Sequence, residues 1–222
     1  SHPDIWLELE TNDTEAAASP TEGEGAPAFW PWVQMIRAYV HDREPAMLMA
    51  EMGPGAVAIA QVVSEVRERL PDLPNPPPLE GEQARFRLFD SITMFLKNAA
   101  KTQPLVLVLD DLHWADKASL MLLQFLAREI ADARLLLIGT YRDLEVGRQH
   151  PLAQTLAELA RERLSQRVLL RGLEQQDVSR FIEMTASVTA PSALVAAVYT
   201  ETEGNPLFIS EVVRLLVTEG RL

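Results

Sequence analysis

The 222-residue chain contains no cysteine, which excludes disulfide bonds and metal sites built on thiolates. No apolar run approaches the roughly 18 residues that indicate a membrane-spanning helix. The acidic amino-terminal residues lack the basic start of a secretory signal. These absences make a reducing cytoplasm the expected location, with no membrane partner.

Positive charge is also scarce, because 20 Lys and Arg stand against 32 Asp and Glu for a net charge of −12. Residues 1–25 hold seven acids and no Lys or Arg, so we expect a solvated acidic arm over residues 1–22. A chain with this balance and no basic stripe is poorly suited to neutralising phosphates. We therefore expect no direct nucleic acid binding by this segment, and a DNA-binding regulator is disfavoured.

Hydrophobic periodicity predicts strands that alternate with helices, followed by helices alone. This order indicates an α/β fold with a parallel sheet over residues 23–172 and a small helical lobe over residues 173–222. Strands are predicted at residues 105–110, 134–140 and 167–171, with a short one at 5–10. Helices are predicted at residues 29–41, 55–70, 82–100, 117–131, 151–163, 177–186, 191–200 and 206–219, with a loop at 11–26 and a proline-rich connector at 71–78.

The most informative segment is an apolar strand that ends in two adjacent carboxylates. Five aliphatic residues, 105–109, predict a strand buried on both faces of the sheet, and Asp110 and Asp111 follow it directly. Residues at the carboxyl end of such a strand face the crevice in which open α/β sheets bind ligands. Two acids there fit a Mg²⁺–nucleotide site, one for the metal and one for water. The segment has the form of a Walker B motif.

Several polar and aromatic neighbours of this motif have structural interpretations. Asp111 either serves catalysis or caps the following turn. Asp116 is expected to be the N-cap of the helix that begins at about residue 117. Trp114 is expected to pack, and the cluster at residues 30–32 (WPW) is expected to serve the core rather than to stack on a ligand. His113 follows the acids into the loop near the site and is a candidate contact for nucleotide or magnesium-bound water.

Five motifs occur in a familiar order: GEGAPAFWPWVQ (23–34), RFRLFD (85–90), PLVLVLDDLHWAD (104–116), LLLIGTYRD (135–143) and TEGNPLFISEVVRLL (202–216). Over roughly residues 22–220 the chain resembles the ATPase domain of STAND-type signal-transduction NTPases, an AAA-like branch of the P-loop superfamily. Such domains occur in large bacterial transcription activators and cyclase-linked regulators. The resemblance implies Mg-ATP as cofactor, ATP or ADP as ligand, other domains of the same regulator as partners, and self-association.

The resemblance also implies roles for individual residues. Asp110 matches the acid that holds Mg²⁺, usually through water, and Asp111 matches the acid that polarises the attacking water. Arg142 matches the sensor arginine that reads the γ-phosphate, for which a planar guanidinium is well suited. Pro206, in a Gly-x-Pro motif, matches a proline that packs near the adenine.

Two of these residues have structural alternatives. Arg142 could instead form an ion pair with Asp143 or with an acid of the Walker B motif. Pro206 could simply occupy the first turn of a helix, whatever the ligand.

The family's phosphate loop is missing from this sequence, because none of its ten glycines begins a Gly-x-x-x-x-Gly-Lys-Ser/Thr pattern. That loop supplies backbone N–H groups, a helix N-terminus and a lysine for the phosphates. We therefore expect nucleotide binding and slow hydrolysis by this chain to be impaired. The alternative is a non-catalytic protein-interaction module, or a truncated remnant of such a regulator.

The missing loop has a consequence for folding. In the superfamily the phosphate-loop strand lies between the strands that match residues 134–140 and 167–171. Its absence would leave two buried strand edges with unpaired backbone groups. We expect either that residues 5–10 occupy that position or that the strand at 167–171 docks directly.

Overall fold

The computed structural model describes residues 6–7, 27–76, 81–186 and 188–221. The chain divides into two compact units, Ser1–Gln166 and Arg167–Leu222. The first holds the parallel sheet with its helices, and the second holds helices alone. The predicted loop at 11–26 and most of the predicted acidic arm lie outside the described residues.

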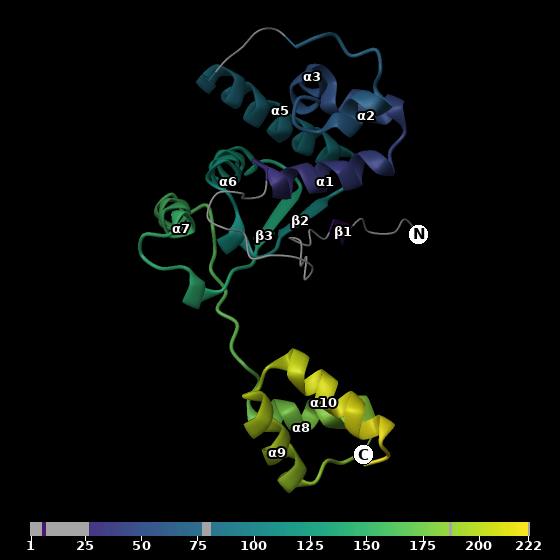
Figure 1. Cartoon of the computed structure of the whole chain (residues 1–222), viewed down its shortest axis with the longest axis vertical. Coiled ribbons are helices and arrows are strands. Elements are labelled where there is room, and N and C mark those ends of the chain that lie inside the picture. The colour runs from purple at the N-terminus through teal and green to yellow at the C-terminus, as the bar shows by residue number, and fades with distance from the viewer. Residues whose placement is uncertain (1–5, 8–26, 77–80, 187, 222) are drawn as a thin grey trace. The chain divides into compact units, whose positions relative to one another are not determined.

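The sheet of the first unit is small and parallel. Strand β2 (Leu105–Leu109) lies between β1 (Trp6–Leu7) and β3 (Leu135–Gly139), as Figure 1 shows. Leu109 pairs with Gly139 at the carboxyl end of the β2–β3 ladder. A mixed fold with a parallel sheet agrees with the predicted α/β class.

The two faces of this sheet differ in burial. Leu105, Leu107 and Leu109 are buried on one face. On the other face Val106 and Val108 are half-buried, while Leu136 and Ile138 are 56% and 41% exposed. The prediction that the strand at 105–109 is buried on both faces is therefore wrong, and the strand predicted at 134–140 has one exposed face. Among the described residues, nothing buries Leu136 and Ile138 of β3, whereas Leu135 and Leu137 on the other face are half-buried.

Neither expected filling of the missing strand position is observed. Residues 6–7 pair with Val106 and Leu107 of β2, on the side away from β3, while the rest of 5–10 lies outside the described residues. Residues 167–171 form no strand, and all five are exposed, including the apolar Val168, Leu169 and Leu170. Their apolar pattern indicates a strand, but a strand also needs a partner.

The described helices of the first unit follow the predicted ranges except at residues 45–52, where no helix was predicted, and at 55–70. They are α1 (Trp30–His41), α2 (Pro45–Met52), α3 (Ala56–Ile59), α4 (Ser64–Arg69), α5 (Gly81–Thr102), α6 (Lys117–Glu129) and α7 (Pro151–Arg161), with short 3₁₀ turns η1 (Gly53–Gly55), η2 (Leu112–Trp114) and η3 (Asp143–Glu145). The single helix predicted over 55–70 is wrong, because a turn separates α3 from α4. Two adjacent β-branched residues, Val62 and Val63, lie at this break, where helix propensity is low. No helix among the described residues has both the length and the apolar character to cross a bilayer.

The core of the first unit forms where α1, α5 and α6 pack together. The predicted inner face of α5 is buried at Phe89, Ile92, Phe95 and Ala99. Phe86 is the exception, because it lies in the second turn of α5 and is exposed, with its ring 5.6 Å from that of Phe125.

The aromatic cluster at residues 30–32 serves the core, as predicted. Trp32 is almost fully buried, and its indole N–H donates to the carbonyl oxygen of Ser119 at 3.1 Å. Buried indoles usually need such a partner. Trp30 is half-buried, and the guanidinium of Arg37 lies 5.3 Å from the centre of its ring.

The second unit is a three-helix cluster of α8 (Gln175–Ala186), α9 (Ser192–Thr202) and α10 (Pro206–Thr218). Its small core comprises Val178, Ile182, Val195, Val198, Ile209 and Val213, among others. The turn before α10 packs tightly on the segment before α8, because the Leu173 N–H donates to the carbonyl oxygen of Gly204 at 2.7 Å. A Cβ on Gly204 would lie 2.2 Å from the Leu173 carbonyl oxygen.

We predict that Gly204→Ala destabilises the chain far more than Gly220→Ala. Both glycines have positive φ, +77° and +66°, but a Cβ on Gly220 would meet nothing within 4 Å. Backbone strain alone should cost about 1 kcal/mol at Gly220, and the added backbone clash should raise the loss at Gly204 to about 3 kcal/mol or more. Urea denaturation followed by circular dichroism measures both. Equal losses would contradict the close approach.

Candidate functional site

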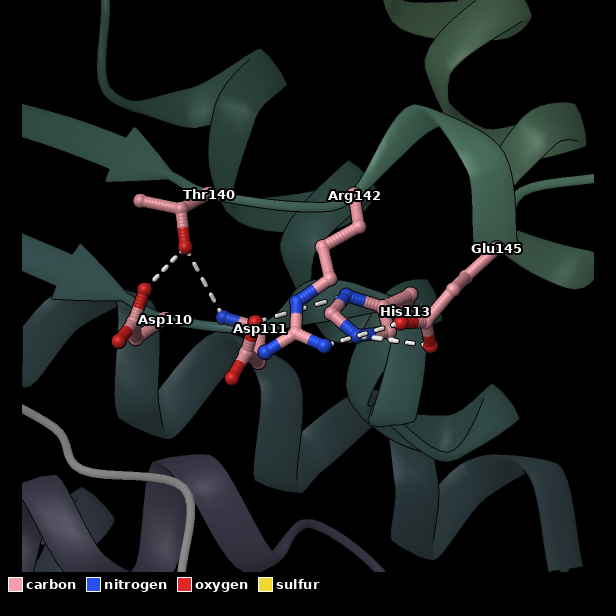
Figure 2. Close-up of polar contacts among 6 residues, drawn as sticks. All are labelled: Asp110, Asp111, His113, Thr140, Arg142 and Glu145. Atoms are coloured by element: carbon pink, nitrogen blue, oxygen red, sulfur yellow. Dashed lines mark hydrogen bonds and ion pairs between the residues drawn. The ribbon is translucent and has the colours of Figure 1, made fainter. Parts of the chain in front are cut away.

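The carboxyl ends of β2 and β3 bring the polar residues of the candidate site together. Asp110 directly follows β2, and Thr140 directly follows β3. Because Leu109 and Gly139 are paired in register, the two following side chains meet at one edge of the sheet (Figure 2).

Thr140 fastens both predicted acids to the end of β3. Its hydroxyl donates to Oδ1 of Asp110 and accepts the backbone N–H of Asp111, the latter at 3.0 Å. Backbone bonds continue the ladder, from Thr140 N–H to the Leu109 carbonyl at 2.9 Å and from Leu112 N–H to the Thr140 carbonyl at 2.8 Å. Two hydrogen bonds thus hold the acids to Thr140, and two more hold Leu109 and Leu112, the residues on either side of them, to the same residue.

Asp111 turns the chain out of the sheet. Its φ and ψ are 49° and 46°, in the left-handed region that Asp and Asn tolerate better than most residues. Asp111 occupies the N-cap position of η2, but its side chain makes no capping hydrogen bond. The capping alternative raised from the sequence is therefore not observed, and the carboxylate lies 3.7 Å from the His113 ring instead.

His113 is buried beneath the loop, with its side chain only 1% exposed. Nδ1 lies 3.7 Å from an Asp111 oxygen, and Nε2 lies 3.2 Å from Oε2 of Glu145. Neither ring nitrogen makes a hydrogen bond of good geometry despite these short separations. An unsatisfied buried polar group costs about 1–3 kcal/mol, so the fold tolerates an unfavourable arrangement here.

Arg142 follows β3 and lies at the solvent-facing side of the same cluster. Its Nη1 is 3.2 Å from Oε1 of Glu145, one turn of η3 further along the chain. The guanidinium is largely exposed, so it is accessible to an anion. The sequence raised an ion pair for Arg142, and Glu145 is a partner that was not among those considered.

Two neighbours of the motif have structural roles that can be read directly. Asp116 caps α6, because its Oδ1 accepts the N–H groups of Ala118 at 2.9 Å and Ser119 at 3.0 Å; the predicted N-cap is confirmed. The prediction that Trp114 packs is wrong, because its side chain is 71% exposed. In the short η2 turn, Leu112 and His113 take the inward positions, which leaves Trp114 facing solvent.

Pro206 lies in the second unit, as the first residue of α10. The Asn205 side chain caps this helix by accepting the N–H of Leu207 at 3.0 Å. The first-turn position expected for Pro206 is thus confirmed, and its contact with adenine stays a prediction.

The sequence did not single out Thr140 or Glu145, although each left a signal. Thr140 is a polar residue at the carboxyl end of a strand, the same criterion that identified Asp110. Glu145 stands three residues after Arg142, a spacing that allows an ion pair within one helical turn. Its approach to His113 depends on how η2 and η3 meet, which no local pattern reveals.

The cluster carries an excess of negative charge, with Asp110, Asp111 and Glu145 against Arg142. Among the described residues, no group of three or more acids, histidines or cysteines is placed to hold a metal ion by itself. Mg²⁺ commonly binds through one or two carboxylates and fills its other positions with water and phosphate oxygens. The donor set at Asp110 fits that mode of binding.

A family model described as "AAA ATPase domain" matches residues 7–138, more than half of the chain. The chain belongs to the AAA ATPase domain family. No curated protein and no solved structure matches it. The matched range runs from β1 through most of β3 and includes Asp110, Asp111 and His113, whereas Thr140, Arg142 and Glu145 follow its end.

Family membership confirms the coarser part of the sequence interpretation, an AAA-like ATPase domain with an α/β fold. It supports a nucleotide-hydrolase-like module in general, with ATP and Mg²⁺ as the ligands that such domains bind. The two acids at the end of β2 therefore lie within the matched domain, at the edge of the sheet where ligands bind in α/β folds.

We predict that Thr140→Val releases the acids from β3. Valine keeps the β-branched shape but loses the hydroxyl that bonds Asp110 and the Asp111 amide. Because one such bond is worth roughly 1 kcal/mol, the Asp111 amide should exchange with deuterium about fivefold faster or more. The Leu112 amide, bonded to the Thr140 backbone carbonyl, is the internal control and should keep its protection. Unchanged exchange at Asp111 would contradict the role of the hydroxyl.

Proposed function

We propose that the chain is the ATPase-core segment of a STAND-type signalling or transcriptional regulator. In the intact family, Mg-ATP binding and slow hydrolysis act as a conformational switch, and we propose that both are impaired in this chain. The observation that carries the proposal is the meeting of Asp110, Asp111 and Arg142 at the carboxyl edge of two parallel strands in an AAA ATPase domain.

The geometry supports separate tasks for the two acids. Asp110 is fixed by the Thr140 hydroxyl, which leaves its other carboxylate oxygen for a magnesium-bound water. A bound Mg²⁺ would neutralise phosphate charge. Asp111 lies in a left-handed turn, and its backbone N–H donates to the Thr140 hydroxyl. Its carboxylate makes no capping hydrogen bond. We assign it to polarising the attacking water.

Arg142 is assigned to the γ-phosphate. Its exposed guanidinium pairs with Glu145 through Nη1 and has other N–H donors to offer to an anion. Phosphate oxygens suit this planar group, and its position at the end of β3 places it beside the two acids. The buried ring of His113 lies against the Asp111 carboxylate and is assigned to positioning it. Pro206 is assigned to adenine contact by resemblance alone.

The expected impairment follows from the lack of a phosphate-binding loop. The sequence has no Gly-x-x-x-x-Gly-Lys-Ser/Thr segment, and among the described residues no strand pairs with the outer edge of β3. That edge is where the superfamily's phosphate-loop strand is expected. Exposed Leu136 and Ile138 on β3 are consistent with a sheet that lacks this neighbour and its covering helix.

The second candidate is a non-catalytic interaction module or a truncated remnant of such a regulator. The exposed apolar side chains of β3 favour it, since uncovered sheet faces are common contact surfaces. Its partners would be other domains of the same regulator or a second copy of the chain. A net charge of −12 disfavours nucleic acid as a partner.

We predict weak, Mg²⁺-dependent ATP binding, with a dissociation constant of about 1 mM rather than ~1 µM, because the main phosphate anchors are missing. Asp110→Ala should abolish the residual binding. Asp132→Ala is the matched control, since Asp132 pairs with Lys97 away from the site. Isothermal titration calorimetry of the purified chain measures all three.

The outcomes separate the candidates. Micromolar binding that Asp110→Ala weakens would support the nucleotide site and contradict the impairment. Micromolar binding that survives Asp110→Ala would contradict the site itself. Complete absence of binding at millimolar nucleotide would favour the interaction module.

A further inference from the structure

His113 connects two loops that the sequence keeps far apart. Its buried ring lies between the Asp111 carboxylate, 3.7 Å from Nδ1, and the Glu145 carboxylate, 3.2 Å from Nε2 (Figure 2). Asp111 belongs to the turn after β2, whereas Glu145 closes the η3 turn after β3. The imidazole thus spans the interior between the two loops that form the site.

Glu145 in turn faces two partners. One carboxylate oxygen lies beside the His113 ring, and the other lies 3.2 Å from Nη1 of Arg142. A continuous series of charged and polar groups therefore runs from Asp111 through His113 and Glu145 to Arg142. It begins at the second acid and ends at the exposed arginine, the two groups with the most direct roles under the proposed function.

We propose that His113 and Glu145 are positioning residues that couple Asp111 to Arg142. The catalytic meaning of this coupling rests on the proposed function. An anion that engages Arg142 competes with Glu145 for the guanidinium. Movement of Glu145 changes the charge beside the His113 ring, and the ring transmits that change to Asp111. The state of the phosphate-sensing arginine is thereby communicated to the acid that orients water.

The environment of His113 supports this role over simple space-filling. The ring is 1% exposed, yet neither nitrogen makes a well-formed hydrogen bond. An apolar side chain of similar size would fill the space without burying unsatisfied nitrogens. Two carboxylates approach the ring from opposite loops, so a small shift of either one can complete a hydrogen bond. A group between two incomplete contacts is suited to responding to its neighbours.

The test is nuclear magnetic resonance of the isotope-labelled chain, with the Asp111 carboxyl carbon and the His113 ring nitrogens as probes. Glu145→Gln keeps the shape of the side chain and removes its charge. We expect Glu145→Gln to change the chemical shifts of both the His113 ring nitrogens and the Asp111 carboxyl carbon. Glu145→Asp, which keeps the charge, should return these chemical shifts most of the way to their wild-type values. Glu162→Gln is the matched control. Glu162 follows α7 and pairs with Arg128 of α6, so this variant also removes the charge of a glutamate that is paired with an arginine. It should move neither probe.

A second pair of variants tests whether the effect of Glu145 on Asp111 passes through the His113 ring or is a direct long-range electrostatic effect. In a His113→Gln or His113→Phe background, Glu145→Gln should no longer shift the Asp111 carbon. The proposal would be overturned if Glu145→Gln left the chemical shift of the Asp111 carbon unchanged. It would also be overturned if Glu145→Gln changed that chemical shift equally with and without His113. These measurements need no nucleotide. Failure to bind Mg-ATP would count against the proposed function alone, and failure of the coupling would count against the network alone.

Discussion

The parallel pairing of β2 with β3 is the constraint on which the candidate site depends. The ladder runs from the Leu105 amide, bonded to the Arg134 carbonyl, to the Leu112 amide, bonded to the Thr140 carbonyl. Beyond the last pair of strand residues, the Thr140 side chain extends the same contact to Asp110 and Asp111. Both site loops therefore start from one hydrogen-bonded edge: strand register places Asp110 beside Thr140, and the left-handed turn at Asp111 directs the second acid.

The two faces of the same sheet differ in how well they are covered. Its inner face is filled by α1, α5 and α6, while its other face exposes Leu136 and Ile138 on β3. Among the described residues, the outer edge of β3 pairs with no strand. An uncovered apolar face beside an unpaired edge is costly in water. Both features fall on β3, the strand that leads directly to Thr140 and Arg142.

The sequence was sufficient for features that local pattern determines. Five aliphatic residues followed by Asp110 and Asp111 predict β2 and the two acids at its end. The position of Asp116 before a helical pattern predicts an N-cap. The sequence failed where the outcome depends on distant neighbours. The run at 167–171 has a strand pattern but no strand partner, and Trp114 faces solvent because residues 112 and 113 take the inner positions. Glu145 contacts His113 because the loops after β2 and β3 meet in space. The sequence of either loop alone does not predict that contact.

Charge decides what this edge of the sheet can accept. The cluster holds three carboxylates and one guanidinium; the guanidinium of Arg142 pairs with Glu145, and the His113 imidazole lies between Asp111 and Glu145. Two like charges 4 Å apart repel by about 4 kcal/mol at an effective dielectric constant of 20, so a triphosphate approaching alone would be disfavoured. A divalent cation held by Asp110 would offset that repulsion, and Arg142 would then add a second positive group for the phosphate. If the site binds nucleotide, cation and phosphate must therefore enter together, and the carboxylates that repel a free anion become the reason for magnesium dependence.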